Sequence, residues 1–259
     1  MELFGDWKAK ARKGGVAASG VLTLVAFWWW VTRGDLETGA MAPRFAPGLT
    51  FESLGEILAG SDLTRHALVS LRRIFVGLAA ALALGIPLGL VIGSFHLLAR
   101  ATSVAFQFLR MISPLSLMPM AVMAFGVGDR PIYYLLSFVA LWPVVLSTGA
   151  GVRALDERLL ELGRSLSASR VELLWEIIVP GVLGHLLTGT RLAIGVLWIV
   201  LVPCEMLGVS AGLGYYILDA RDRLAYSELM AMILVIGGLG FLLDASARAL
   251  CARFGAEVS

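Results

Sequence analysis

The stretch IFVGLAAALALGIPLGLVIGSFHLLA, residues 74–99, runs for 26 residues without an aspartate, glutamate, lysine or arginine. A run of about 20 apolar residues is long enough to cross the hydrocarbon core of a membrane as an α-helix. The whole chain has this character, because 58% of its 259 residues are hydrophobic and 15% are charged, against roughly 25% charged in a soluble domain. The composition therefore predicts a membrane protein.

Five further apolar stretches accompany this one. Those at 14–32, 111–128 and 131–152 contain no charge, whereas the fifth predicted span contains Arg191 and Glu205. A membrane β-barrel would alternate apolar and polar residues, and these stretches are apolar on both faces. We predict an all-α membrane protein with six transmembrane helices, near residues 14–32, 68–93, 103–126, 131–151, 181–207 and 226–247.

The tail at residues 1–13 is basic and precedes the first apolar run. A cleaved signal peptide is the alternative for this region, since Ala40-Met41-Ala42 resembles a cleavage site. We favour a retained first span that is part of a single transmembrane domain over 14–259. The tryptophans at 28–30 then form an aromatic belt at the membrane surface.

The distribution of lysine and arginine predicts the orientation. The tail 1–13, the loop near Arg100, the segment 153–180 and the C-terminal tail together carry more of these residues than the opposite loops, which places both termini in the cytoplasm. Arg72 and Arg73 lie where the second span begins, and we expect their long side chains to extend to the membrane surface. The protein is then a multi-pass membrane protein.

The polar segment 153–180 predicts two short amphipathic helices between the fourth and fifth spans. Asp156 can cap the first helix, which should end near Ser167. Its apolar residues recur with helical spacing at Leu155, Leu159, Leu162 and Leu166. A pair of helices lying flat on the membrane is the alternative.

The second helix of the segment should begin at a capping box formed by Ser169 and Glu172. Its apolar face is expected at Val171, Leu174, Trp175 and Ile178. Pro180 suits the first turn of the following span, where its missing N–H has no helical partner to lose.

The same segment resembles the conserved cytoplasmic loop of ATP-binding-cassette importer permeases, Glu-Ala-Ala, three residues, Gly, nine residues, Ile-x-Leu-Pro. The matching residues have the same spacing and are Glu161, Leu162, Gly163, Ser167, Ile177, Val179 and Pro180. HALVSLRRIFVGLAAALALGIPLGLVIGS at 66–94, EMLGVSAGLGYYILDARD at 205–222 and VIGGLGFLLD at 235–244 are similar to the permeases of nitrate, taurine and alkanesulfonate importers.

This resemblance implies the fold of a type I importer permease, a location in the bacterial inner membrane and a set of partners. A second permease copy would form a homodimer, two cytoplasmic ATPase subunits would bind ATP and Mg²⁺, and an extracytoplasmic binding protein would deliver the substrate. The ATPases would dock on the loop 153–180, where the resemblance gives the coupling residues as Glu161, Leu162, Gly163, Arg164, Ser167, Ala168, Ser169, Arg170 and Pro180. The chain itself lacks the P-loop pattern of ATPases, so we expect a transport subunit and not an enzyme.

The expected cargo is a small anion such as nitrate, bicarbonate, taurine or another sulfonate, with some uncharged heterocycles as alternatives. Transport would occur by alternating access, driven by the docked ATPases. A secondary transporter would usually show inverted repeats or paired carboxylates at membrane depth, and an intramembrane enzyme would need a nucleophile and base. Neither signature is evident in the sequence, and the scattered histidines and cysteines predict no metal site.

Several residues inside the spans are candidates for packing or transport. Gly85, Gly89 and Gly93 recur every fourth residue and predict a face on which another helix packs closely. Pro114, Ser116 and Pro119 are candidates for the transport pathway, because broken helices at membrane depth tend to line cavities.

The charged residues of the fifth span are the other candidates. Arg191 should face the interior, where it either attracts an anion or bonds to backbone carbonyls at a gate. Glu205 lies about 21 Å further along the helix at ~1.5 Å per residue, so it is not expected to pair with Arg191.

Overall fold

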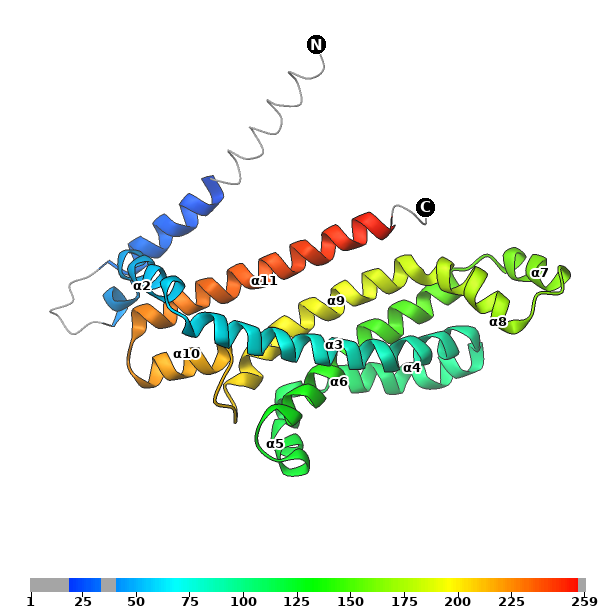
Figure 1. Cartoon of the computed structure of the whole chain (residues 1–259), viewed down its shortest axis with the longest axis horizontal. Coiled ribbons are helices and arrows are strands. Elements are labelled where there is room, and N and C mark those ends of the chain that lie inside the picture. Colours follow the sequence, from blue (N-terminus) through cyan, green and yellow to red (C-terminus); the bar gives the residue numbers. More distant parts are fainter. Residues whose placement is uncertain (1–18, 34–40, 256–259) are drawn as a thin grey trace, which may run out of the picture. The chain divides into compact units, whose positions relative to one another are not determined.

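The computed structural model describes residues 19–33 and 41–255, and within these ranges every regular element is a helix (Figure 1). The predicted all-α fold is confirmed. The tail 1–13 and the first five residues of the span 14–32 lie outside the described residues. The chain divides into two compact units, residues 1–62 with 219–235 and residues 63–218 with 236–259, which are described separately below.

The first unit contains the apolar helix Ser19–Val31, a 3₁₀ turn η2 (Ala42–Phe45), α2 (Pro47–Ala59) and the start of α11 (Tyr226–Gly255). The Trp28 indole N–H donates a hydrogen bond to the Phe45 carbonyl at 2.9 Å, and the Phe45 ring meets Tyr226 edge-on. Trp28 therefore fixes the turn η2, while its neighbours Trp29 and Trp30 remain exposed.

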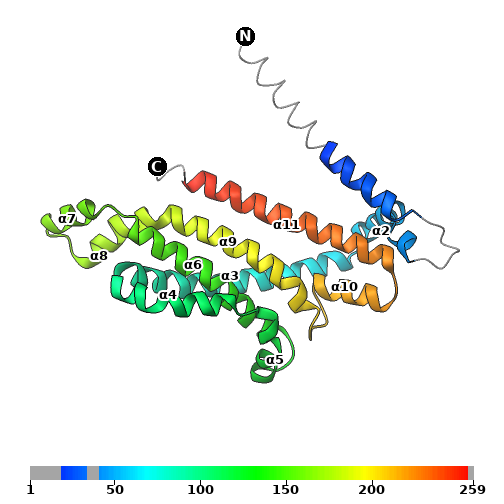
Figure 2. The same cartoon turned by 180° about the vertical axis from the view of Figure 1, so that it is seen from behind.

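The second unit contains most of the long helices. They are α3 (Asp62–Ser94), α4 (His96–Met111), α5 (Pro114–Phe125), α6 (Asp129–Arg153), α7 (Glu157–Ser165), α8 (Arg170–Glu172), η3 (Leu173–Ile178), α9 (Val179–Glu205) and the first part of α10 (Leu213–Asp222), followed by the later part of α11. Helices α6 and α9 lie side by side, and α7 and α8 lie beyond their shared end (Figures 1 and 2).

Four described helices are long and apolar enough to cross a membrane: α3, α6, the continuous helix Arg170–Glu205 and α11. The helix Ser19–Val31 is also apolar but shorter within the described residues. The span expected near 103–126 is broken into two helices, because α4 and α5 meet at an angle of 87°. Ser113 lies between them in an extended conformation, as expected of a residue that precedes a proline, here Pro114.

The second amphipathic helix of the segment 153–180 is not separate from the fifth span. Residues 173–178 form a π-helical turn that joins α8 to α9, and the Val179 N–H donates to the Leu174 carbonyl five residues earlier. A proline ring would clash with the carbonyl four residues before it in a regular helix. The wider turn before Pro180 accommodates that ring, so the helix continues where a break was expected.

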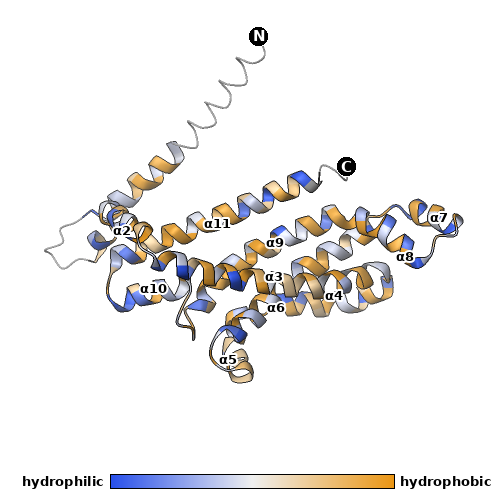
Figure 3. Cartoon of the chain, viewed as in Figure 1, coloured by the Kyte–Doolittle hydropathy of each residue, from blue (hydrophilic) through white to orange (hydrophobic). Residues whose placement is uncertain are grey.

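The core of the second unit forms where α6 packs between α3 and α9. The predicted glycine face of α3 lies against α6: a Cβ on Gly85, Gly89 or Gly93 would lie 2.8, 2.6 or 2.6 Å from Val144, Thr148 or Val152. On the α9 side, a Cβ on Gly189 would lie 2.6 Å from Ser147. The helices of this core are largely apolar along their length, and polar residues gather at α7 and α8 (Figure 3).

Candidate functional site: the loop 153–180 and the charged clusters of the spans

The segment 153–180 folds from strong local signals. Asp156 is the N-cap of α7, and its carboxylate accepts a hydrogen bond from the Arg158 N–H at 3.0 Å. Ser169 and Glu172 form the predicted capping box, in which the Glu172 carboxylate accepts from the Ser169 N–H and the Ser169 hydroxyl accepts from the Glu172 N–H. The Ser169 N–H lowers the pKa of Glu172 because it stabilises the ionised carboxylate.

Ser167 ends the first helix in a left-handed conformation, with φ of 60°. The Ala168 N–H donates to the Gly163 carbonyl and the Ser167 N–H to the Arg164 carbonyl, both at 3.0 Å. These two bonds form a Schellman motif, whose left-handed residue is usually glycine. Ser167 occupies the position of the glycine in the importer loop pattern, so the backbone turn is retained although the residue differs.

Gly163 brings α7 against the π-helical turn. A Cβ at this position would lie 2.6 Å from the Leu173 side chain and 3.0 Å from Ile177, and Gly163 is buried. The two halves of the loop therefore pack directly on each other and form one unit. Because η3 continues into α9, a displacement of α7 is transmitted to that span.

The outer surface of the loop is apolar and has no partner within the chain's described residues. Its large apolar side chains are 50–75% exposed and belong to Leu159, Leu162, Leu166, Val171 and Trp175. Glu161, Arg164 and Arg170 are also exposed, and none forms an ion pair with a described residue. Pro180 is exposed in the first turn of α9. An exposed apolar surface surrounded by unpaired charges is typical of a protein interface.

At the opposite end of the second unit, Glu205 lies in a buried ionic cluster. Its side chain is fully buried and accepts hydrogen bonds from Arg73 at 2.6 Å, Ser70 at 2.8 Å and the Gly214 N–H at 2.9 Å. Arg73 is 2% exposed and also donates to Asp129 at 2.6 Å. The expectation that Arg73 extends to the membrane surface is wrong, because two carboxylates hold it inside.

This cluster joins elements that are distant in the sequence. Arg73 and Ser70 come from α3, Asp129 begins α6, and Glu205 ends α9. No spacing pattern pairs residues that lie more than 130 positions apart in the chain. A buried carboxylate without a cation is costly, so the position of Glu205 within a span did indicate that an arginine or lysine from another span pairs with it.

Arg191 pairs with a carboxylate of α11. Its Nε lies 3.3 Å from Asp244 Oδ1, and Arg248 also contacts Asp244. As expected, Glu205 is not its partner. Both side chains of the Arg191–Asp244 pair are about two fifths exposed in this single chain, so other subunits have room to approach them.

The proline candidates lie in α5. Pro114 occupies the first turn, Ser116 is exposed, and Pro119 is inside the helix and also exposed. The structure thus places all three in the helix that follows the 87° bend.

Comparison with known proteins identifies the family. Residues 85–256 match the family described as "Binding-protein-dependent transport system inner membrane component". The taurine transport system permease protein TauC of Escherichia coli is 33% identical over 89% of this chain and 85% of its own length. The nitrate import permease NrtB of Synechocystis is 33% identical over 68% of this chain, and the bicarbonate transport permease CmpB of Synechococcus elongatus is 32% identical over 69%.

The matches to NrtB and CmpB cover 64% and 65% of those proteins, just under two thirds of their length. Among solved structures, an inward-facing MetNI methionine ABC transporter chain aligns with a TM-score of 0.63 at 15% identity, over 74% of this chain and 96% of that one. An amino acid ABC transporter chain aligns with a TM-score of 0.54 at 17% identity. These two likenesses show the type I importer permease fold. The chain belongs to the family of inner-membrane permease components of binding-protein-dependent ABC importers.

Proposed function

We propose that two copies of this permease form the membrane channel of an importer for a small anion, driven by two ATPase subunits that dock on the loop 153–180. The ATPases bind ATP and Mg²⁺, and an extracytoplasmic binding protein delivers the cargo at the other end of the spans. Both termini and the loop then lie in the cytoplasm. The chain contributes the pathway and the coupling surface, and the chemistry of ATP belongs to its partners.

The observation that carries this proposal is the exposed surface of the loop. Leu162 and Trp175 are 58% and 64% exposed, although they lie on short helices held in fixed positions by caps and by the Gly163 contact. A rigid helical unit with an uncovered apolar face supports docking by an apolar groove. Glu161, Arg164 and Arg170 would then determine register through charge complementarity.

The docking test compares Leu162→Glu and Trp175→Glu with Leu207→Glu. Leu207 is 49% exposed at the opposite end of the second unit, so the control adds the same charge to a similar apolar position. Both loop variants should insert into the membrane but retain less than about a tenth of the co-purified ATPase. Retention of the ATPase at wild-type levels by both variants would refute docking on this surface.

Orientation is tested with single cysteines in a chain lacking Cys204 and Cys251. Ser165→Cys lies on α7, and Ser210→Cys lies between α9 and α10. Ser210 is a better site than its neighbour Gly212, where a Cβ would lie 2.4 Å from the Glu205 carboxyl carbon. An impermeant thiol reagent outside intact cells should label position 210 and not position 165. Labelling at 165 and not at 210 would show the opposite orientation of the chain in the membrane.

The anion class is supported by the named transport roles of the relatives for taurine, nitrate and bicarbonate. Calorimetry of the cognate binding protein with nitrate, bicarbonate, taurine and ethanesulfonate should identify a ligand. Proteoliposomes containing the complete complex should then accumulate that anion in an ATP-dependent manner. Binding of only uncharged compounds would refute the anion assignment and leave the importer architecture standing.

A further inference from the structure

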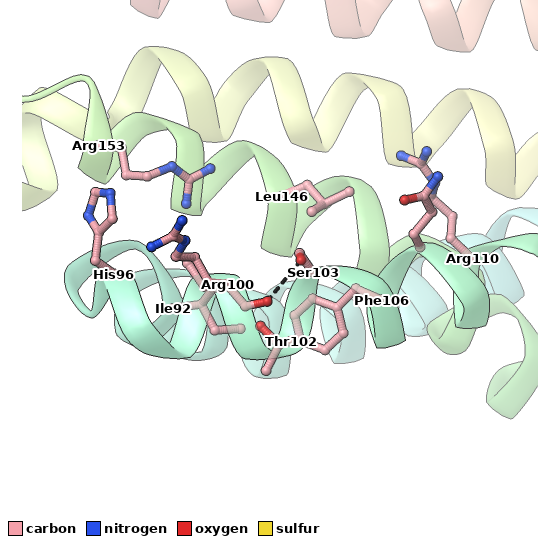
Figure 4. Close-up of a pocket in the computed structure, with 11 residues that line it drawn as sticks. Ile92, His96, Arg100, Thr102, Ser103, Phe106, Arg110, Leu146 and Arg153 are labelled. Carbon is pink, nitrogen blue, oxygen red and sulfur yellow. Dashed lines mark hydrogen bonds between the residues drawn. The ribbon is translucent and has the colours of Figure 1, made fainter.

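A cavity of about 450 Å³ lies between α4 and α6 and is strongly basic (Figure 4). His96, Arg100 and Arg110 of α4 and Arg153 of α6 line it, and none of the lining residues, all within the described ranges, is acidic. Figure 4 shows Arg100 and Arg153 extending toward one another across the gap. The cavity therefore concentrates positive charge in an open site between two helices.

The arginines of this cavity have no carboxylate partner among the described residues. Arg73 and Arg191 each pair with a carboxylate, whereas Arg100, Arg110 and Arg153 form no ion pair with any residue that the structure describes. Facing guanidinium groups repel each other, and the repulsion grows as the surroundings become less like water. An anion between them would remove that repulsion, and guanidinium groups bind oxyanions through paired hydrogen bonds.

Helix α4 directs this basic face toward α6. Arg100, Ser103, Gln107 and Arg110 recur at spacings of three and four residues, which places them on one side of the helix. The neighbouring positions Leu97, Val104 and Phe108 carry apolar side chains that are 84%, 75% and 68% exposed. Arg100, Ser103, Gln107 and Arg110 are themselves exposed in this single chain, so an anion can reach them.

The basic residues extend along the helix. Arg110 lies ten residues after Arg100, about 15 Å further at 1.5 Å per residue, and α4 ends one residue later, at the bend into α5. A lipid headgroup stays at the depth of the membrane surface and could contact only one end of this row. A small anion that moves between the bend and the end of α6 could contact all of it.

We propose that the cavity between α4 and α6 binds the transported oxyanion, with Arg100 and Arg153 as its principal ligands and Arg110 as a contact nearer the bend. This site rests on the proposed import of an anion and assigns the residues that bind it. Thr102, Ser103 and Gln107 supply neutral hydrogen-bonding groups for a partly hydrated ion. The site gives a common role to three neighbouring arginines that form no ion pair with a described residue.

The first test measures uptake by the complete complex of permease, ATPase and binding protein in proteoliposomes, with nitrate, bicarbonate, taurine and ethanesulfonate as cargo. Arg100→Gln and Arg153→Gln should reduce uptake at least tenfold while complex yield stays at the wild-type level, and Arg100→Lys should recover most of the loss. Arg130→Gln is the matched control, since Arg130 is an exposed arginine at the other end of α6, and it should change uptake less than twofold. Wild-type uptake by both glutamine variants would overturn the site while the proposed function stands.

The second test does not depend on transport. Ser103→Cys, in a chain lacking Cys204 and Cys251, places a thiol in the cavity of the purified permease–ATPase complex. A negatively charged methanethiosulfonate should label it at least tenfold faster than a positively charged one, Arg100→Gln should abolish this preference, and the cargo anions should slow the labelling.

This labelling decides the site even if the wild-type complex imports none of the four anions, which would refute the proposed function alone. Nanodiscs of phosphatidylcholine with and without phosphatidylglycerol distinguish a lipid headgroup from a free anion. No charge preference, or labelling slowed by phosphatidylglycerol and by none of the free anions, would overturn the proposal.

Discussion

Removal of the Glu205 carboxylate should destabilise the permease strongly. Glu205→Ala leaves Arg73 buried with only Asp129 and the Ala211 carbonyl as acceptors. It also leaves the Ser70 hydroxyl and the Gly214 N–H without the acceptor that they use in the native protein. The loss therefore combines a broken ion pair with two unsatisfied donors in a fully buried site.

The magnitude follows from these contacts. Removing one partner of a buried ion pair costs about 3–5 kcal/mol. The remaining bond between Arg73 and Asp129, a partly exposed carboxylate, offsets some of this cost, so we expect a loss of about 3 kcal/mol at the lower end of that range. Glu205→Gln should lose less than Glu205→Ala, because its amide oxygen can still accept a hydrogen bond from Arg73 or Ser70.

The free energy of unfolding can be measured in mixed detergent micelles by titration with a denaturing detergent, followed by tryptophan fluorescence. Asp222→Asn is the control, since the pair Arg221–Asp222 is more than half exposed and should contribute less than about 1 kcal/mol. A loss below 1 kcal/mol for Glu205→Ala, equal to the control, would show that the cluster does not hold the helices together.

Three further changes test the packing and the loop. Gly89→Val should destabilise the permease by about 1–3 kcal/mol, because a Cβ would lie 2.6 Å from Thr148 and 2.8 Å from the Val145 carbonyl. Gly237→Val is the control, since a Cβ at Gly237 would meet no atom within 4 Å and should not clash. Equal effects of the two changes in a thermal-unfolding assay would contradict the packing argument. Ser167→Gly should stabilise the loop by up to about 1 kcal/mol, since it relieves a left-handed non-glycine residue, and slower hydrogen exchange at residues 163–168 would report it. Ser169→Ala should lower the local unfolding free energy of α8 by about 1 kcal/mol, and unchanged exchange there would argue against the capping box. The folded-state pKa of Glu172 lies below its ordinary value of 4.5, so its carboxylate contributes to the stability of α8 fully at neutral pH. This contribution is lost as the pH falls through the lower pKa. Protection of α8 from hydrogen exchange should therefore be constant from pH 7 to 5 and decline in more acidic solution.

Local features of this protein could be predicted from the sequence because the responsible residues are close in the chain. The Asp156 cap, the Ser169–Glu172 capping box and the end of the first helix near Ser167 each depend on groups within five residues of one another. The spans could be located because an apolar run of about 20 residues is enough to identify a helix that can cross the membrane. The continuity of α8 with α9 was missed, since a π-helical turn leaves no pattern in the residue types.

Long-range charge pairing could not be predicted in the same way. Asp129 and Glu205 each needed a cation, but several arginines were available and the sequence did not rank them. Arg73 was misplaced because its position near a span end also suited a side chain directed to the membrane surface. Asp244 was missed as the partner of Arg191 because 53 residues separate the two.

The contacts of the second unit indicate where a transport cycle can deform it. The glycine contacts lock α3 to α6 and α6 to α9, and the Glu205 cluster ties the same three helices at one end, so a relative displacement among them would break close packing or a buried ion pair.

Helix α4, in contrast, has no buried residue and meets α6 across the basic cavity. A force applied to α7 passes through Gly163 to η3 and α9, and hence to α6, while α4 is the neighbour that can separate from α6 at the least cost. Such a separation would move Arg153 away from Arg100 and weaken their hold on a shared anion. A second cavity, of about 630 Å³, shares His96 and Arg153 with the first and reaches Arg164 of the loop 153–180. ATPase docking and anion binding would therefore act on the same end of α6, so that coupling requires no long chain of intermediate contacts.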